Sequence, residues 1–154
     1  MIPTFTLQPG APGAGVWSTR AQIVAGTCVC AGATAFLYAV NPTQHAVYPQ
    51  CMLYKMTGLY CAGCGATRAL YALLHGRVLD AMHDNVLFIA VLPVLLYVVG
   101  GHMLAAWRAN AWPQVSVGGP VLWRVLGFFA LMLVFMVLRN LPGAPFELLR
   151  PLAG

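Results

Sequence analysis

Three apolar stretches, each long enough to cross a bilayer as a helix, constrain this chain more than any other feature of its sequence. They cover residues 22–40, 85–106 and 121–138, and one charged residue, Arg124, lies within them. A helix needs about 20 mostly apolar residues to cross the hydrocarbon core. The sequence therefore predicts an all-α integral membrane protein with about three transmembrane helices.

The composition supports this prediction. Of the 154 residues, 60% are hydrophobic and 7% are charged, whereas about 25% are charged in an ordinary soluble domain. The net charge is +5, but the basic residues are scattered and form no stripe with interleaved aromatic side chains. We therefore expect a lipid bilayer as the partner of this chain, and no nucleic acid.

The remaining segments give the domain organisation. Residues 1–20 are rich in proline and glycine, which is typical of a flexible tail. We expect one membrane domain over residues 21–150 and a short tail over residues 151–154. Asn85 is placed to cap the second span and Pro93 to kink it. A cleaved signal peptide is the alternative for the first span, which is long for one.

Three spans place the segment of residues 43–84 and the C-terminus on one side of the membrane. The basic residues of that side are Lys55, Arg68, Arg77, Arg139 and Arg150. Those of the opposite side are Arg20, Arg108 and Arg124. The excess favours a cytoplasmic location for the cysteine-bearing segment.

That segment contains a C-x-x-C pair followed by a predicted helix. Good helix formers run over residues 66–74, and Gly76 is placed to end the helix in a left-handed conformation. Cys61 and Cys64 thus precede a helix N-terminus, where backbone N–H groups stabilise a thiolate, and Arg68 adds a positive charge one turn later. We expect Cys64 to be unusually acidic.

Three interpretations of the cysteines remain open. Cys61 and Cys64 suit a redox pair with Cys51 as exchange partner, as in a thiol-disulfide oxidoreductase. The same three thiols suit a zinc site completed by His75 or His83, although only one tight ligand pair is present. Alternatively, the thiols are small apolar groups in a closely packed re-entrant or interfacial helix. His75 also suits a helix-terminal cap.

Arg68 lies on an apolar helix next to the membrane, so we expect it to pair with a carboxylate. The available partners are Asp80, Asp84 and Glu147. Cys28 and Cys30 lie inside the first span and are expected to pack as apolar residues.

The cysteine segment resembles the domain-of-unknown-function 2752 family of small bacterial membrane proteins. A TGLYC-x-GCG-x-TRA-x-x-x-LL-x-G run follows an earlier cysteine, and the likeness extends over about residues 48–93. Residues 138–142 with Pro145 and Phe146 also look like the C-terminal end of that family. The motif maps onto Cys51, Thr57, Gly58, Cys61, Gly63, Cys64, Gly65, Thr67, Arg68, Ala69, Leu74, Gly76 and Asn85. Ala62 and Val86 stand where the family commonly has proline.

The resemblance implies a bacterial inner or plasma membrane protein, and it brings no established activity, substrate or cofactor. We expect a non-catalytic binding or assembly module built around the cysteine loop, with other membrane proteins or a second copy as partners. The alternatives are the oxidoreductase and the zinc-binding protein. A transporter component would need oligomerisation, because three spans without a buried carboxylate seldom enclose a pathway.

Overall fold

The computed structural model describes residues 18–44, 48, 51–113, 119–143 and 146–149. These residues form helices and connecting turns, and no strand occurs among them. The helices are α1 (Thr19–Ala39), α2 (Met52–Thr57), α3 (Ala66–Leu74), α4 (Val78–Ala109), α5 (Gly119–Asn140) and the 3-10 helix η1 (Phe146–Leu149). The predictions for residues 1–17, the Glu147 side chain, Arg150 and residues 151–154 lie outside the described part.

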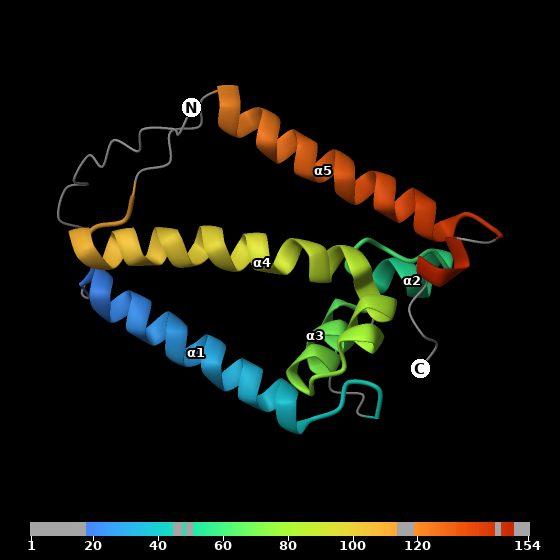
Figure 1. The fold of residues 1–154 in the computed structure, drawn as a ribbon, viewed down its shortest axis with the longest axis horizontal. Helices are drawn as coiled ribbons and strands as arrows, with labels where there is room; N and C mark the ends of the chain where they lie inside the picture. The colour runs from blue at the N-terminus through green and yellow to red at the C-terminus, as the bar shows by residue number, and fades with distance from the viewer. Residues whose placement is uncertain (1–17, 45–47, 49–50, 114–118, 144–145, 150–154) are drawn as a thin grey trace.

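Three helices are long and apolar enough to cross a membrane. They are α1, α4 and residues Val121–Asn140 of α5. The predicted all-α fold with three spans is therefore confirmed. In Figure 1, α1 and α4 meet where α1 begins and α4 ends, and α5 diverges from α4 toward its own first turn.

Polar contacts fix the end where α1 and α4 meet. Arg20 Nε donates to the Trp107 carbonyl over 3.1 Å, and Trp112 Nε1 donates to Gln22 Oε1 over 2.7 Å. The guanidinium of Arg20 also lies over the Trp107 ring. Tryptophan and arginine side chains of this kind are typical of the membrane interface.

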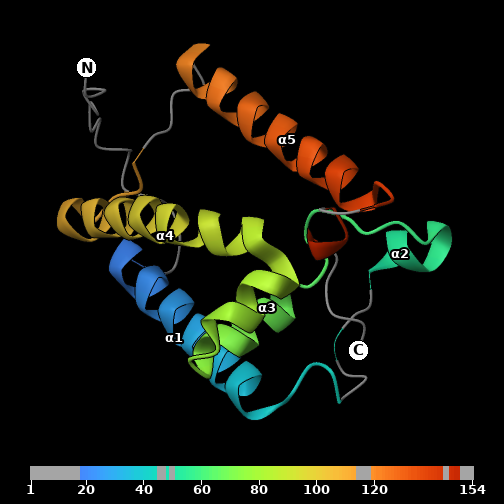
Figure 2. The same ribbon diagram turned by 45° about the vertical axis from the view of Figure 1, so that its right-hand side comes forward.

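At the other end, α3 folds back against the first turns of α4 (Figure 2). Ala69, Ala72 and Ala81 are 0%, 2% and 0% exposed and form the contact. Their small side chains let the two helix backbones approach closely, and Phe88 and Ile89 cover the contact from further along α4. This helical hairpin carries the cysteine loop.

Asn85 divides α4 into two parts. Its φ of −161° and ψ of 90° are extended, so the helix is interrupted there. The Phe88 N–H donates to Asn85 Oδ1 over 2.9 Å, which confirms the predicted cap. The helix also begins earlier than predicted, at Val78. The backbone leaves helical geometry at Asn85, whose side-chain oxygen accepts from the Phe88 N–H of the following turn. Pro93 lies within α4, and the kink expected there stays a prediction.

The sequence predicted one of the two short α-helices, α3, and not the other, α2. Helix α3 covers the predicted residues, and Gly76 follows it with φ +72°, the left-handed conformation expected of a helix end. Helix α2 was not predicted. It ends at Gly58, which has φ +73°.

Candidate functional site

The cysteine loop is a tight turn that leads directly into α3. Cys64 N–H donates to the Cys61 carbonyl over 3.1 Å, and Ala66 N–H donates to the Gly63 carbonyl over 3.0 Å. Gly65, the N-cap of α3, has φ +83°, which a residue with a Cβ rarely adopts. The turn therefore requires glycine at this position and directs the Cys64 side chain inward.

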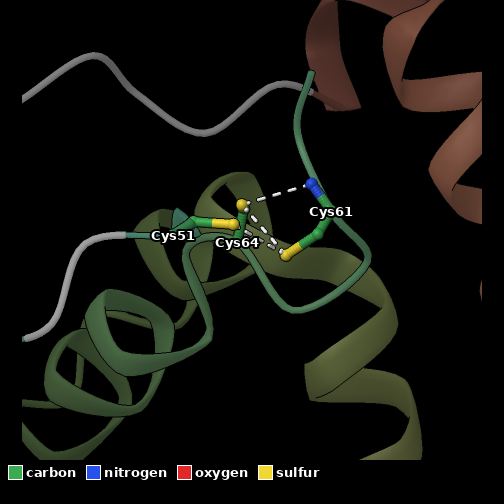
Figure 3. A group of neighbouring side chains, drawn as sticks. All are labelled: Cys51, Cys61 and Cys64. Atoms are coloured by element: carbon green, nitrogen blue, oxygen red, sulfur yellow. Dashed lines mark hydrogen bonds between the residues drawn. The ribbon is translucent and has the colours of Figure 1, made fainter. Parts of the chain in front are cut away.

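Three sulfur atoms converge at this loop (Figure 3). The Cys61 sulfur lies 3.1 Å from that of Cys64 and 3.4 Å from that of Cys51, and the three sulfurs all lie within 4.8 Å of one another. Cys51 arrives from the start of α2, and the other two come from the turn before α3. The structure thus brings together the three cysteines that the sequence singled out.

The two candidate histidines lie elsewhere. His75 Nδ1 lies 2.9 Å from the Tyr71 carbonyl, and its ring stacks on Tyr38 with centroids 4.4 Å apart. His83 has a buried Nδ1 without a hydrogen-bond partner. Among the described His, Cys, Asp and Glu residues, none other than the three cysteines belongs to the sulfur group. His75 is thus the C-cap residue of α3, which was the alternative interpretation of this histidine.

The acidity of the cysteines differs from the expectation. Burial raises the pKa of Cys64 to about 12. The backbone amide of Tyr54, in the first turn of α2, lowers the pKa of Cys51 to about 7. The expected acidic Cys64 is therefore wrong, because Gly65 occupies the N-cap of α3 and the Cys64 sulfur is buried. Cys51 has the acidic thiol instead.

Arg68 faces a carboxylate, as expected. Its Nε lies 3.5 Å from Asp84 Oδ1, and the two side chains are 23% and 10% exposed. Asp80 instead lies 3.7 Å from Arg77, and that pair is exposed. Arg68 therefore ties α3 to α4 rather than supporting the Cys64 sulfur.

Arg139, at the end of α5, is the functional residue that the sequence analysis missed. It is 0% exposed. Its Nη1 donates to the carbonyl oxygens of Cys61 and Cys64 over 3.3 and 2.7 Å, and its Nη2 donates to the Asp84 carbonyl over 2.8 Å. An arginine at the end of an otherwise apolar span was the available signal, but it was counted as an orientation charge and as part of the family-like run of residues 138–142, with no role in the site.

Two asparagines also hold the loop. Asn85 Nδ2 donates to the carbonyls of Ala62 and Cys64 over 2.9 and 3.2 Å. Asn140 Nδ2 donates to the Tyr60 carbonyl over 2.8 Å, and its Oδ1 accepts from the Tyr60 N–H over 2.9 Å. Since buried carbonyls need donors, these bonds fix the path of the chain around the sulfurs.

The other motif residues shape this loop locally. A Cβ at Gly63 would lie 3.9 Å from the Cys61 sulfur, an ordinary contact. Thr67 is exposed in the first turn of α3. Neither residue reaches the sulfur group with a polar atom, so the chemistry of the site rests on the cysteines and the residues that hold them.

Residues 51–99 match the family model described as protein of unknown function, DUF2752. This confirms the predicted family resemblance over that segment. The DUF2752 segment contains the three cysteines, α3, Asp84 and Asn85, whereas Arg139 lies beyond it. No curated protein and no solved structure was found to match the chain.

Proposed function

We propose that this protein is a membrane metal-binding module in which Cys51, Cys61 and Cys64 hold one thiophilic ion, with zinc as the first candidate. The observation that carries the proposal is the convergence of three sulfurs within 4.8 Å of one another. A tetrahedral zinc ion with bonds of about 2.3 Å keeps its sulfurs roughly 3.8 Å apart. The observed separations of 3.1 and 3.4 Å need only a small opening to accept it.

This assignment gives a chemical basis to the non-catalytic binding or assembly role. An ion held by three thiolates would join the start of α2 to the turn before α3, which the described residues otherwise connect by weaker contacts. Three protein ligands leave a fourth tetrahedral position for water or for a ligand from a partner. A partner membrane protein could therefore dock on the module through this position.

We place the module in a bacterial inner or plasma membrane, with the cysteine side toward the cytoplasm. The cytoplasm keeps thiols reduced, and reduced thiols are the form that binds metal. The expected neighbours are lipid, other membrane proteins or a second copy of the chain.

Metal analysis of the purified full chain tests the proposal. The protein is extracted in detergent under reductant without chelator, and the metal content per chain is measured by mass spectrometry. About one ion per chain is expected in the wild type, with loss in Cys51→Ser, Cys61→Ser and Cys64→Ser. Cys28→Ser and Cys30→Ser are matched controls, because both residues are exposed on α1. Background metal in the wild type contradicts the proposal.

A second candidate, a thiol-disulfide oxidoreductase, is favoured by the short distances between the sulfurs, 3.1 Å from Cys61 to Cys64 and 3.4 Å from Cys61 to Cys51. Cys51 has a pKa of about 7 and Cys64 has one of about 12, which separates an attacking thiolate from a buried resolving thiol. Cys61 lies between them and can pair with either, since its sulfur is 3.4 and 3.1 Å from theirs.

Acid trapping distinguishes the two candidates. Cells are quenched in acid, free thiols are alkylated, and the masses of the cysteine peptides are read before and after reduction. A disulfide between Cys61 and either Cys51 or Cys64 in a substantial fraction of the wild-type chain supports the oxidoreductase. Three free thiols together with bound metal support the metal-binding module.

A further inference from the structure

We infer that Arg139 is the positioning residue of the thiolate site, and that the C-terminal end of α5 supplies its positive charge as the counter-charge of the metal-bound thiolates. This inference rests on the metal site proposed above. It assigns a role to a helix that lies outside the DUF2752 segment.

The placement of Arg139 is the first argument. Its guanidinium donates hydrogen bonds to the backbone carbonyls of both cysteines of the C-x-x-C pair. The rings of Tyr60 and Phe135 lie 5.8 and 5.4 Å from it and help to exclude water. In such a site the charge is only weakly screened.

Charge balance is the second argument. A divalent ion with three thiolates has a net charge of −1, which one guanidinium neutralises. Arg68 and Asp84 neutralise each other nearby. Among the described basic residues, Arg139 is the one that is buried, and burying an arginine is costly unless an opposite charge accompanies it.

The hydrogen bonds to the loop carbonyls do not by themselves require a charged residue at position 139. Asn85 and Asn140 hold neighbouring carbonyls of the same loop with neutral amides. The buried Arg139 Nε, moreover, has no hydrogen-bond partner. The positive charge of Arg139 is therefore not fully compensated by groups of the protein itself. It can stabilise the negative charge of the thiolates.

The contact between α5 and the cysteine loop explains which helix supplies the charge of Arg139. In Figures 1 and 2, α5 reaches the loop at its C-terminal end and lies apart from α4 at its other end. Residues 122–131 are all exposed. The last turn of α5 thus contacts the cysteine loop, while residues 122–131 are exposed and face lipid in a membrane.

Metal affinity in a variant series tests the inference. Affinity for Co²⁺ is measured by titration of the metal-free full chain against a competing chelator. Arg139→Met should weaken binding about 10- to 100-fold, the usual effect of losing a residue that supports a metal site. Arg139→Lys, which keeps the charge but loses the planar fork, should bind within a few-fold of the wild type.

The matched control is Asn140→Ala, which removes two hydrogen bonds from the same loop without changing its charge. It should also bind Co²⁺ within a few-fold of the wild type. The thiolate-to-cobalt absorption band should move to longer wavelength in Arg139→Met only, because the sulfur electrons are then less stabilised. Arg139→Gln, which keeps a hydrogen-bond donor, replaces Arg139→Met if the latter does not fold.

Equal losses in Arg139→Lys, Asn140→Ala and Arg139→Met would overturn the inference and make the role purely structural. Unchanged affinity in Arg139→Met would overturn it as well. Both outcomes leave the proposed metal site intact. A wild-type chain that binds no Co²⁺ or Zn²⁺ instead refutes the metal site itself.

Discussion

At the scale of single residues, the cysteine group combines an acidic thiol with a thiol that resists ionisation. Cys51 begins a helix and its sulfur is partly exposed, whereas Cys64 is buried behind the turn. The same loop therefore lowers the pKa of Cys51 and raises the pKa of Cys64. The backbone hydrogen bond at Cys51 and the burial of Cys64, rather than position relative to the C-x-x-C motif, decide which thiol is the more acidic.

Alkylation of the metal-free, reduced chain should follow this order. Because the pKa of Cys51 is lowered to about 7, its thiolate forms as the pH rises through neutrality. Cys64, with a pKa of about 12, stays a thiol at pH 8. In a chain with Cys28→Ser and Cys30→Ser, mass spectrometry should show iodoacetamide on Cys51 well before Cys64. Equal rates at pH 8 would contradict the assignment.

The ion pair between Arg68 and Asp84 should contribute measurably to stability. Arg68→Gln is expected to lower the free energy of unfolding by about 1–3 kcal/mol, between the values for exposed and buried pairs. Thermal unfolding in detergent measures the change. Arg77→Gln is the control, because the pair of Arg77 and Asp80 is about half exposed and should contribute little. Similar effects of the two substitutions would count against a special role for Arg68.

At the scale of elements, α4 is two helices joined at Asn85. The first part packs on α3 through alanines, and the second part is long and apolar enough to cross a membrane. Asn85 serves both parts, because its Oδ1 accepts from Phe88 N–H while its Nδ2 donates to the cysteine loop. One side chain thus couples the start of a span to the shape of the site.

Substitutions at Asn85 separate these two roles. Asn85→Ala removes the cap and the loop bonds and should cost about 2–4 kcal/mol of unfolding free energy. Asn85→Ser keeps a capping oxygen but is too short to reach the loop, so it should be about 1 kcal/mol more stable than Asn85→Ala. Both should expose Cys64 to alkylation. If Cys64 stays protected in both variants, the loop does not depend on Asn85.

The sequence predicted the spans, helix α3 and its glycine end, because apolar length and helix-ending residues act locally. It did not predict α2, since six residues between Cys51 and Gly58 show no resolvable periodicity. It also assigned the acidic thiol to Cys64, because burial of that sulfur depends on contacts distant in sequence. It did not predict the role of Arg139, because that role depends on a contact between α5 and the cysteine loop. Cys64 lies 75 residues before Arg139 in the chain.

At the scale of the whole molecule, three successive helices are long and apolar enough to cross a membrane. The start of α1 and the end of α4 are bonded to each other, so α1 and α4 run in opposite directions. Helix α5, the third candidate span, ends at the cysteine loop, where Arg139 bonds the Cys64 carbonyl. Residues 18 and 112 are therefore expected on one side of the bilayer, and residues 51 and 141 on the other.

We expect the orientation of this arrangement to follow from charges that act before folding. Arg68 and Arg139 end up paired or buried, but they still contribute to the positive charge of their side during insertion. We therefore expect the cysteine side to face the cytoplasm, which also suits a reduced metal-binding site.

Cysteine labelling in intact cells tests this topology with a membrane-impermeant maleimide. A background with all five natural cysteines replaced by serine carries one introduced cysteine, either Ser18→Cys or Leu141→Cys, both at exposed positions. Ser18→Cys should be labelled from outside, and Leu141→Cys only after the membrane is opened. Labelling of both from the same side would refute the three crossings. The reverse pattern would keep the crossings but place the cysteine loop outside, where disulfide formation is favoured and the oxidoreductase becomes the better candidate.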